Sequence, residues 1–436
     1  MAIAGFPRTA FEEALKRTLS PTTPIRSSEY LRGREKKLED IRRALVQPGR
    51  HIFIYGDRGV GKTSLAQTAA FEHQSASNAP IFLGCDPSSS FSRVAQELAG
   101  RLLSHDPRMV KQTIQSKASA GWAPVAIAEK QRVIEHGPLC EPRSVNEATT
   151  LIAHAAKEHS EQPVIVIDEF ERIQDSDQRS MFADFIKQAG DQSLPVKLIF
   201  CGVGSALDQL LDAHHSCYRY LAAVELERLA QKPLLEIVDA AASAAGVTIE
   251  ESSYYRIPKI SDGFPHYVHL ITEKLLWEIY QDPEPVRRST ANHYIAAIRA
   301  AVQDIEPKLK ATYNTATLKY SNSDEYEAVL WAAADHHELK RRSTDIFNVY
   351  CALSREQNLT PVNRDKFNQR INALKRDTHG SILEGNRQGW YHFREAVMRG
   401  YVRLRAEAQG IELGADHPSE YRGPGRLRSA PHRQDR

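Results

Sequence analysis

The pattern of hydrophobic and polar positions changes character near residue 228. Before that point, short apolar runs alternate with longer stretches in which apolar residues recur at helical spacing, and this predicts strands that alternate with helices. The expected strands cover residues 51–55, 81–85, 164–167, 196–200 and 223–226. Strands and helices that alternate in this way favour an α/β fold, with a parallel sheet covered by helices on both faces.

After residue 228 the strand pattern stops and helical spacing continues, at residues 230–245, 264–281 and 290–304. Further along, expected helices near 324–335, 342–354 and 362–376 precede two short apolar runs, 381–383 and 390–393, which a turn containing glycine and asparagine separates. Three short helices followed by a hairpin are typical of a winged helix.

These changes predict five parts. We expect a lead-in segment at 1–30, an α/β core at 31–228, an all-α domain at 229–308, a winged helix at 309–405 and a disordered basic tail at 406–436. Residues 104–142 interrupt the alternation with glycine, proline and alanine, and we assign them no role.

Composition narrows the class of protein. The 436 residues include 57 Lys and Arg against 55 Asp and Glu, so any affinity for nucleic acid must come from a local basic patch. The five cysteines show no C-x-x-C spacing, which argues against a zinc site and against a disulfide framework. The sequence has neither a signal-peptide pattern nor an apolar run of membrane-spanning length, so we expect a cytoplasmic protein without membrane contact.

The strongest motif is G-x-x-x-x-G-K-[ST], placed between the strand at 51–55 and a helix that starts at Lys62. Its glycines let backbone N–H groups face a phosphate, and the following helix adds its positive N-terminal end. In such a loop Lys62 reaches the β- and γ-phosphates of ATP, and the Thr63 hydroxyl is a ligand of Mg²⁺. The expected nucleotide-binding residues are Gly56, Asp57, Arg58, Gly59, Val60, Gly61, Lys62, Thr63 and Ser64.

A second motif follows the strand at 164–167, which ends in Asp168 and Glu169. The carboxyl ends of parallel strands meet at one edge of the sheet, where the phosphate loop also lies. We therefore expect Asp168 to hold Mg²⁺ together with Thr63. Glu169 would activate the attacking water, so that Glu169 and Lys62 are the expected catalytic residues in this part of the chain.

The two motifs, the segment Gly33-Arg34-Glu35 and the segment Gly263-Phe264-Pro265-His266 resemble AAA+ ATPases of the origin-recognition and replication-initiator branch, which are related to STAND NTPases. The resemblance covers about residues 25–400. It implies a P-loop domain, a helical lid that closes over the nucleotide and a C-terminal winged helix. It also places Gly33 and Arg34 near the nucleotide.

The chain departs from the family pattern at two positions. Cys201 stands where a polar residue usually senses the γ-phosphate, and Ser205 is the candidate replacement. His266 stands where many AAA+ proteins carry an arginine. A histidine there fits a contact with phosphate and equally fits a helix start whose side chain is satisfied by backbone.

The resemblance also implies that an arginine from a neighbouring subunit completes the catalytic site. Arg219 occupies the family's position for this residue, and Arg228 is the second choice. A residue that acts in this way requires a homo-oligomer or a partner ATPase.

Contact with double-stranded DNA is expected from the helix at 362–376 and from the hairpin tip. The candidate residues are Arg364, Lys366, Arg370 and Arg387, because cationic side chains meet phosphates and base edges. Position 66, in the helix after the phosphate loop, is not among the candidates. The alternative is that the winged helix contacts only protein.

These expectations describe an ATPase with ATP and Mg²⁺ as its cofactors, slow or stimulated by a partner, whose nucleotide state controls assembly and DNA engagement. The alternative is a STAND-like switch that holds ADP or ATP and recruits a protein effector without binding DNA.

Overall fold

The computed structural model describes residues 7–21, 23–74, 78–104, 140–213, 215–318 and 323–414. The chain forms two compact units. The sheet unit comprises Lys36–Gly56 and Lys62–Glu225, and the helical unit comprises Met1–Glu35, Asp57–Gly61 and Leu226–Arg436.

The sheet unit contains a five-stranded sheet in the order β2-β3-β4-β1-β5, in which every pair of neighbours is parallel. Its strands are β1 (His51–Tyr55), β2 (Ile81–Gly84), β3 (Val164–Asp168), β4 (Lys197–Gly202) and β5 (Leu221–Glu225). The predicted α/β class is confirmed. Because β4 lies between β1 and β3, the carboxyl end of β4 separates the ends of the two strands that carry the motifs.

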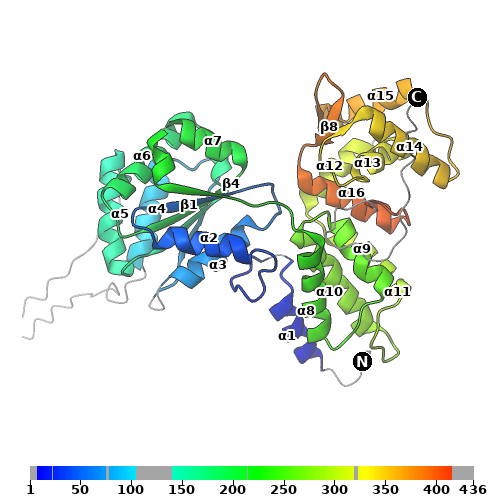
Figure 1. Cartoon of the computed structure of the whole chain (residues 1–436), viewed down its shortest axis with the longest axis horizontal. Helices are drawn as coiled ribbons and strands as arrows, with labels where there is room; N and C mark the ends of the chain where they lie inside the picture. The colour runs from blue at the N-terminus through cyan, green and yellow to red at the C-terminus, as the bar shows by residue number, and fades with distance from the viewer. Residues whose placement is uncertain are drawn as a thin grey trace, which may run out of the picture. The chain divides into compact units, whose positions relative to one another are not determined.

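Helices cover both faces of this sheet (Figure 1). They are α2 (Glu35–Val46), α3 (Lys62–His73), α4 (Phe91–Ser104), α5 (Val145–His159), α6 (Ser176–Asp191) and α7 (Gly204–Ala213), with short 3-10 turns η2 (Phe170–Arg172) and η3 (His215–Arg219). Helices α2 and α3 lie on one face and α4 to α7 on the other. Since side chains of a strand alternate between faces, the apolar runs of β1, β3 and β4 are buried on both sides.

The helical unit begins with α1 (Arg8–Thr18) and continues after β5. Its further helices are α8 (Gln231–Ala244), α9 (Glu251–Ser261), α10 (Pro265–Gln281), α11 (Ala291–Asp304), α12 (Pro307–Thr317), α13 (Ser323–Ala334), α14 (Ser343–Glu356), α15 (Arg364–Ala373) and α16 (Ala396–Ala408), with the 3-10 turn η4 (Asp377–His379). Within the described parts of the chain, no helix combines the length and the apolar character that crossing a membrane requires.

The predicted order of three short helices and a hairpin is present as α13, α14, α15 and the pair β7 (Leu383–Gly385) and β8 (Trp390–Phe393). A short strand β6 (Arg341–Arg342) pairs with β8, so that the antiparallel order is β6-β8-β7. Helix α16 follows and contributes fully buried residues to the core of the helical unit.

Three helices differ from the sequence expectations. Helix α1 lies in the expected lead-in segment, and the ring of Phe11 stacks on Tyr280 with centroids 4.3 Å apart. Helix α9 contains Pro258, and α12 runs across the expected boundary at 308 and 309. Residues 105–139 and 415–436 lie outside the described residues, and they include most of the interrupting segment and most of the expected basic tail.

Candidate functional site

The phosphate-loop motif connects β1 to α3, which starts at Lys62. Gly59 and Gly61 have φ angles of 84° and 98°, a region in which a side chain is strained, so the loop requires glycine at these two positions. The Nζ atom of Lys62 donates a hydrogen bond to the carbonyl oxygen of Gly56 at 3.0 Å. The Lys62 side chain therefore folds back over the loop, which ends where α3 begins.

The first turn of α3 meets the end of β3 through two oxygen-bearing side chains. The Thr63 hydroxyl donates to Oδ2 of Asp168 at 2.6 Å, across 105 positions of sequence. Hydroxyl and carboxylate oxygens suit Mg²⁺, which typically takes one or two protein ligands and completes its shell with water and substrate phosphates. In the ranges the structure describes, no group of three or more His, Cys, Asp or Glu could hold a metal. Thr63 and Asp168 thus fit a magnesium ion that arrives with a nucleotide.

Glu169 follows in a left-handed backbone conformation with φ 54°. Its backbone N–H donates to Oδ1 of Asp168 at 2.8 Å, and its half-exposed carboxylate lies 3.3 Å from Nε of Arg172. Left-handed conformations in residues other than glycine are strained and cluster at functional sites. The arrangement holds Asp168 in place and leaves the Glu169 carboxylate accessible to water.

Glu171 is a carboxylate at the same edge that sequence reasoning missed. Its Oε2 atom is buried and accepts no hydrogen bond from any described residue. A Cβ atom at Gly202, the last residue of β4, would lie 3.3 Å from that oxygen. The signal available in the sequence was a third acidic residue two positions after Glu169.

Cys201 lies fully buried between the two motifs. Its thiol contacts the carbonyl oxygen of Lys62 at 3.9 Å, and burial together with the Asp168 charge raises its pKa well above the usual value. Cys201 is therefore a neutral thiol that packs on the first turn of α3. Ser205, the candidate replacement for a polar sensor, is exposed in the first turn of α7.

The tip of the loop, Asp57–Gly61, belongs to the helical unit. Arg58 pairs with Glu306 at 2.8 Å and lies 3.6 Å from Glu395. A Cβ atom at Gly59 would lie 3.3 Å from Val397 and 3.4 Å from Phe264. Glu306, Phe264 and Glu395 are the N-cap residues of α12, α10 and α16, so three helix starts surround the tip.

Gly33 and Arg34 support this tip from the chain that precedes α2. Arg34 is buried, and its Nη2 donates to the carbonyl oxygens of Val60 at 3.0 Å and Glu227 at 2.5 Å. Burial lowers the pKa of Arg34 to about 10, so the group is charged at neutral pH. A Cβ atom at Gly33 would lie 2.5 Å from Pro233 of α8. Direct contact of these two residues with a nucleotide stays a prediction.

His266 lies in the first turn of α10, where its Nδ1 donates to the carbonyl oxygen of Pro21 at 2.8 Å. This geometry matches the alternative in which backbone satisfies the imidazole. A contact between His266 and phosphate stays a prediction.

The two candidate arginine fingers lie in different surroundings. Arg219 ends η3 and is exposed. Arg228 pairs with the buried Asp262 at 2.7 Å and donates to the carbonyl oxygen of His337 at 3.2 Å. Of the two, Arg219 is the more exposed, since the Arg228 side chain is 22% exposed and already paired.

The four candidate DNA-contacting residues also divide into two kinds. Arg364 donates to the Ser343 hydroxyl at 3.0 Å, with its guanidinium over the Phe347 ring. Arg370 pairs with Glu325 at 2.8 Å. The other two candidates, Lys366 and Arg387, are exposed.

Position 66 is not among the DNA-contacting candidates. The residue there is Ala66, whose side chain has no charge to offer to DNA. Ala66 lies in α3 and is fully buried, as are the apolar neighbours Leu65 and Ala69. A buried methyl group contributes to the core of the sheet unit, whereas a lysine at this position would bring a charge into that core.

Several solved structures match the chain over most of its length at low sequence identity. Cdc6p from Pyrobaculum aerophilum shares 14% identity with a TM-score of 0.45, covering 92% of this chain and 98% of that one. A Walker-type ATPase of Pyrococcus abyssi shares 15% identity with a TM-score of 0.49, covering 87% and 98%. The ORC1 protein of Aeropyrum pernix, solved in complex with DNA, shares 15% identity with a TM-score of 0.43, covering 88% and 97%.

No curated protein sequence matches the chain. The family profile described as AAA ATPase domain matches residues 30–199, a range that contains the phosphate loop, Asp168 and Glu169. The predicted resemblance to AAA+ ATPases is confirmed over this range. Over residues 30–199 the chain is therefore similar to AAA ATPase domains.

Proposed function

We propose that this chain binds Mg²⁺–ATP at residues 56–64, hydrolyses it to ADP and phosphate, and uses its nucleotide state to control assembly and DNA engagement. In this proposal it is an initiator-like AAA+ ATPase, and residues 309–405 act as a winged helix on duplex DNA. The observation that carries the ATPase part is the 2.6 Å contact between Thr63, in the first turn of α3, and Asp168. It supports a metal-assisted phosphoryl transfer because it joins two hard ligands beside the loop.

Each residue has a distinct task in this proposal. The loop backbone and Lys62 hold the phosphates, while Thr63 and Asp168 hold Mg²⁺, which neutralises charge on the transferred phosphoryl group. Glu169 orients the attacking water and accepts its proton. Arg219 of a neighbouring subunit stabilises the transition state.

Two substitutions test the ATPase part. Lys62→Ala should weaken ATP binding, because it removes the cation that meets the phosphates. Glu169→Gln should leave ATP affinity intact and lower kcat by roughly 10²–10⁴, the contribution of a positioned general base. Glu161→Gln, an exposed carboxylate in the same unit, is the matched control. Hydrolysis by Glu169→Gln at the wild-type rate would refute the role of Glu169.

The DNA part is tested with labelled duplex DNA in the absence of nucleotide, with ADP and with a slowly hydrolysed ATP analogue, each at two salt concentrations. We expect binding that weakens with salt and a complex that grows with the ATP analogue. Absence of binding in every state would reject DNA engagement.

A nucleotide switch that recruits a protein effector is a second candidate, and the anchored loop tip favours it. Arg58 pairs with Glu306 and approaches Glu395, which also pairs with Lys308 at 2.7 Å. These carboxylates hold the tip of the phosphate loop on the starts of α12 and α16. A loop held in this way would exchange its nucleotide slowly.

This candidate predicts that Glu306→Gln combined with Glu395→Gln speeds the release of a fluorescent ADP analogue by about tenfold, because each exposed ion pair contributes only modestly. The control is Glu39→Gln, which removes ion pairs with Arg42 and Arg43 on α2. Fast release from the wild-type protein, at the same rate as from the double variant, would reject the switch.

A further inference from the structure

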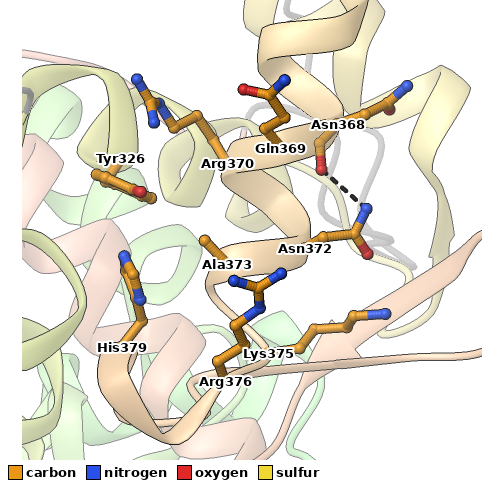
Figure 2. A pocket seen from close by; sticks show the side chains of 9 residues that line it. All are labelled: Tyr326, Asn368, Gln369, Arg370, Asn372, Ala373, Lys375, Arg376 and His379. Carbon is orange, nitrogen blue, oxygen red and sulfur yellow. Dashed lines mark hydrogen bonds between the residues drawn. The ribbon is translucent and has the colours of Figure 1, made fainter.

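The helical unit contains a pocket of about 810 Å³ along the C-terminal half of α15 and the turn that leads into η4 (Figure 2). Tyr326 of α13 closes one side, and His379 of η4 lies below it. Three cationic side chains line the pocket, Arg370, Lys375 and Arg376, and no carboxylate lines it. The pocket is therefore a concave, positively charged surface.

The three cations are not equivalent. Arg370 is paired with Glu325 at 2.8 Å, and its guanidinium lies over the Tyr326 ring at 5.2 Å. Neither Lys375 nor Arg376 forms an ion pair within the ranges the structure describes, and the Lys375 amine lies 5.4 Å from the centre of the Tyr391 ring. The net positive charge of the pocket thus rests on Lys375 and Arg376, two residues that the sequence analysis did not single out.

The charged groups in the pocket favour phosphate, and one of its amides, that of Asn372, is already engaged. The amide of Asn372 donates to the carbonyl oxygen of Asn368 at 2.8 Å (Figure 2). It also accepts from the Tyr391 hydroxyl at 3.2 Å. Both ends of that amide are thus engaged, and a bidentate contact with adenine would have to break them. The accessible charged groups, an ammonium and a guanidinium, are donors only, as an anionic oxygen requires.

The histidine adds to this preference. Burial and the charges of Arg376 and Arg370 lower the pKa of His379 below its usual value, so the imidazole is neutral at neutral pH. With a neutral ring, the positive charge that no carboxylate balances in the pocket comes from Lys375 and Arg376.

We infer that this pocket receives the backbone phosphates of duplex DNA and supplies a sequence-independent part of the affinity through Lys375 and Arg376. The inference rests on the DNA engagement proposed above and names its contacts. The strand backbone of a duplex is a convex ridge of negative charge, which complements a concave cationic surface, whereas bases lie recessed in the grooves.

The test compares Lys375→Ala/Arg376→Ala with Arg287→Ala/Arg288→Ala, a control that removes two adjacent exposed arginines of the same unit outside the pocket. Binding of labelled duplexes is titrated at several salt concentrations, and thermal melting checks folding. We expect the pocket variant to bind about tenfold more weakly, with a salt slope smaller by about 2, because each lost phosphate contact lowers the slope by roughly one. The control should match wild type.

A second variant and a second duplex sharpen the result. Arg376→Ala alone, at an exposed position, should lower the slope by about one. The loss should be the same on A·T-rich and G·C-rich duplexes, since phosphates carry no sequence information. A loss confined to one sequence would overturn the inference in favour of base reading.

The failures of the two proposals are distinguishable. If the wild-type protein binds duplex and Lys375→Ala/Arg376→Ala binds equally well, while Lys366→Ala/Arg387→Ala loses affinity, the pocket is refuted and DNA engagement stands. If the wild-type protein binds no duplex in any nucleotide state at low salt, DNA engagement fails and the inference falls with it.

Discussion

Two buried thiols lie at the carboxyl edge of the sheet, and their chemistry follows from burial. Cys85 donates its backbone N–H to the Asp168 carbonyl at 2.9 Å. Burial raises the pKa of Cys85 to about 12, and that of Cys201 well above the usual value. The thiolate is the reactive form, so neither group should react at neutral pH.

We therefore predict that native protein treated with iodoacetamide at pH 8 is modified at the exposed Cys140 and spared at Cys85 and Cys201. Peptide mass spectrometry before and after denaturation measures the difference. Modification of Cys201 at the rate of Cys140 in the native protein would contradict the burial argument.

His51, the first residue of β1, makes stability depend on pH. Burial, with a contribution from the Lys197 charge, lowers its pKa to about 3. Its Nδ1 accepts from the backbone N–H of Leu198 at 3.3 Å. The unfolded chain binds a proton near the ordinary histidine pKa of about 6.5, whereas the folded chain does not until about pH 3.

The stabilisation is thus complete above pH 6.5 and is lost as the pH falls toward 3. Urea unfolding at pH 7, 6 and 5 should show a free energy of unfolding that falls with a limiting slope of about 1.4 kcal/mol per pH unit for this residue. His51→Gln should remove that share of the slope. An unchanged slope in the variant would show that other groups cause the dependence.

Among the elements, α9 and α16 are joined by one buried carboxylate. Asp262, the C-cap of α9, pairs with Arg399 at 2.6 Å, Arg403 at 3.2 Å and Arg228 at 2.7 Å. Arg399 and Arg403 lie on α16 and are almost fully buried. Asp262 is the counter-ion of both arginines. Backbone carbonyl oxygens also accept hydrogen bonds from both guanidinium groups.

Asp262→Ala should destabilise the helical unit by about 3–5 kcal/mol, since it leaves buried arginine charges without their counter-ion. Denaturant unfolding followed by tryptophan fluorescence measures the change. Glu12→Gln, which breaks the exposed pair with Arg8 on α1, is the control and should leave the midpoint nearly unchanged. Equal effects of the two substitutions would contradict this account.

At the scale of the whole molecule, the proposed role of Arg219 requires more than one chain. An arginine that acts in trans should raise kcat on the order of 10³-fold or more. We predict that Arg219→Ala and Glu169→Gln are each nearly inactive and that mixing them restores ATP hydrolysis, because one chain supplies the arginine and the other an intact catalytic site.

The measurement is the ATPase rate of the mixture against each variant alone at equal total concentration. The control mixture combines Arg219→Ala with Arg219→Ala/Glu169→Gln, which lacks the arginine on both chains and should stay inactive. Wild-type activity that is independent of protein concentration, together with no recovery in the first mixture, would refute action in trans.

The strands of the sheet unit were predictable from short segments of the sequence. The apolar runs of β1, β3 and β4 are buried on both faces, so each is a short continuous signal between polar turns. The sequence pattern did not predict helices α1 and α9, because neither has a clear local pattern of apolar residues. Phe11 of α1 is buried and packs on Tyr280 and Trp277 of α10, and Pro258 interrupts the usual pattern of α9.

The sequence alone determined the phosphate loop, the strand that ends in Asp168 and Glu169, and the parallel sheet, because glycine conformation, strand burial and carboxylate position are properties of short segments. Only the tertiary structure decided which partner each charged group takes. Arg58 meets Glu306 across 248 positions, and Arg370 meets Glu325 across 45. Such pairs depend on which surfaces the fold brings together, and no local spacing encodes them. The pocket beside Lys375 and Arg376 became visible for the same reason.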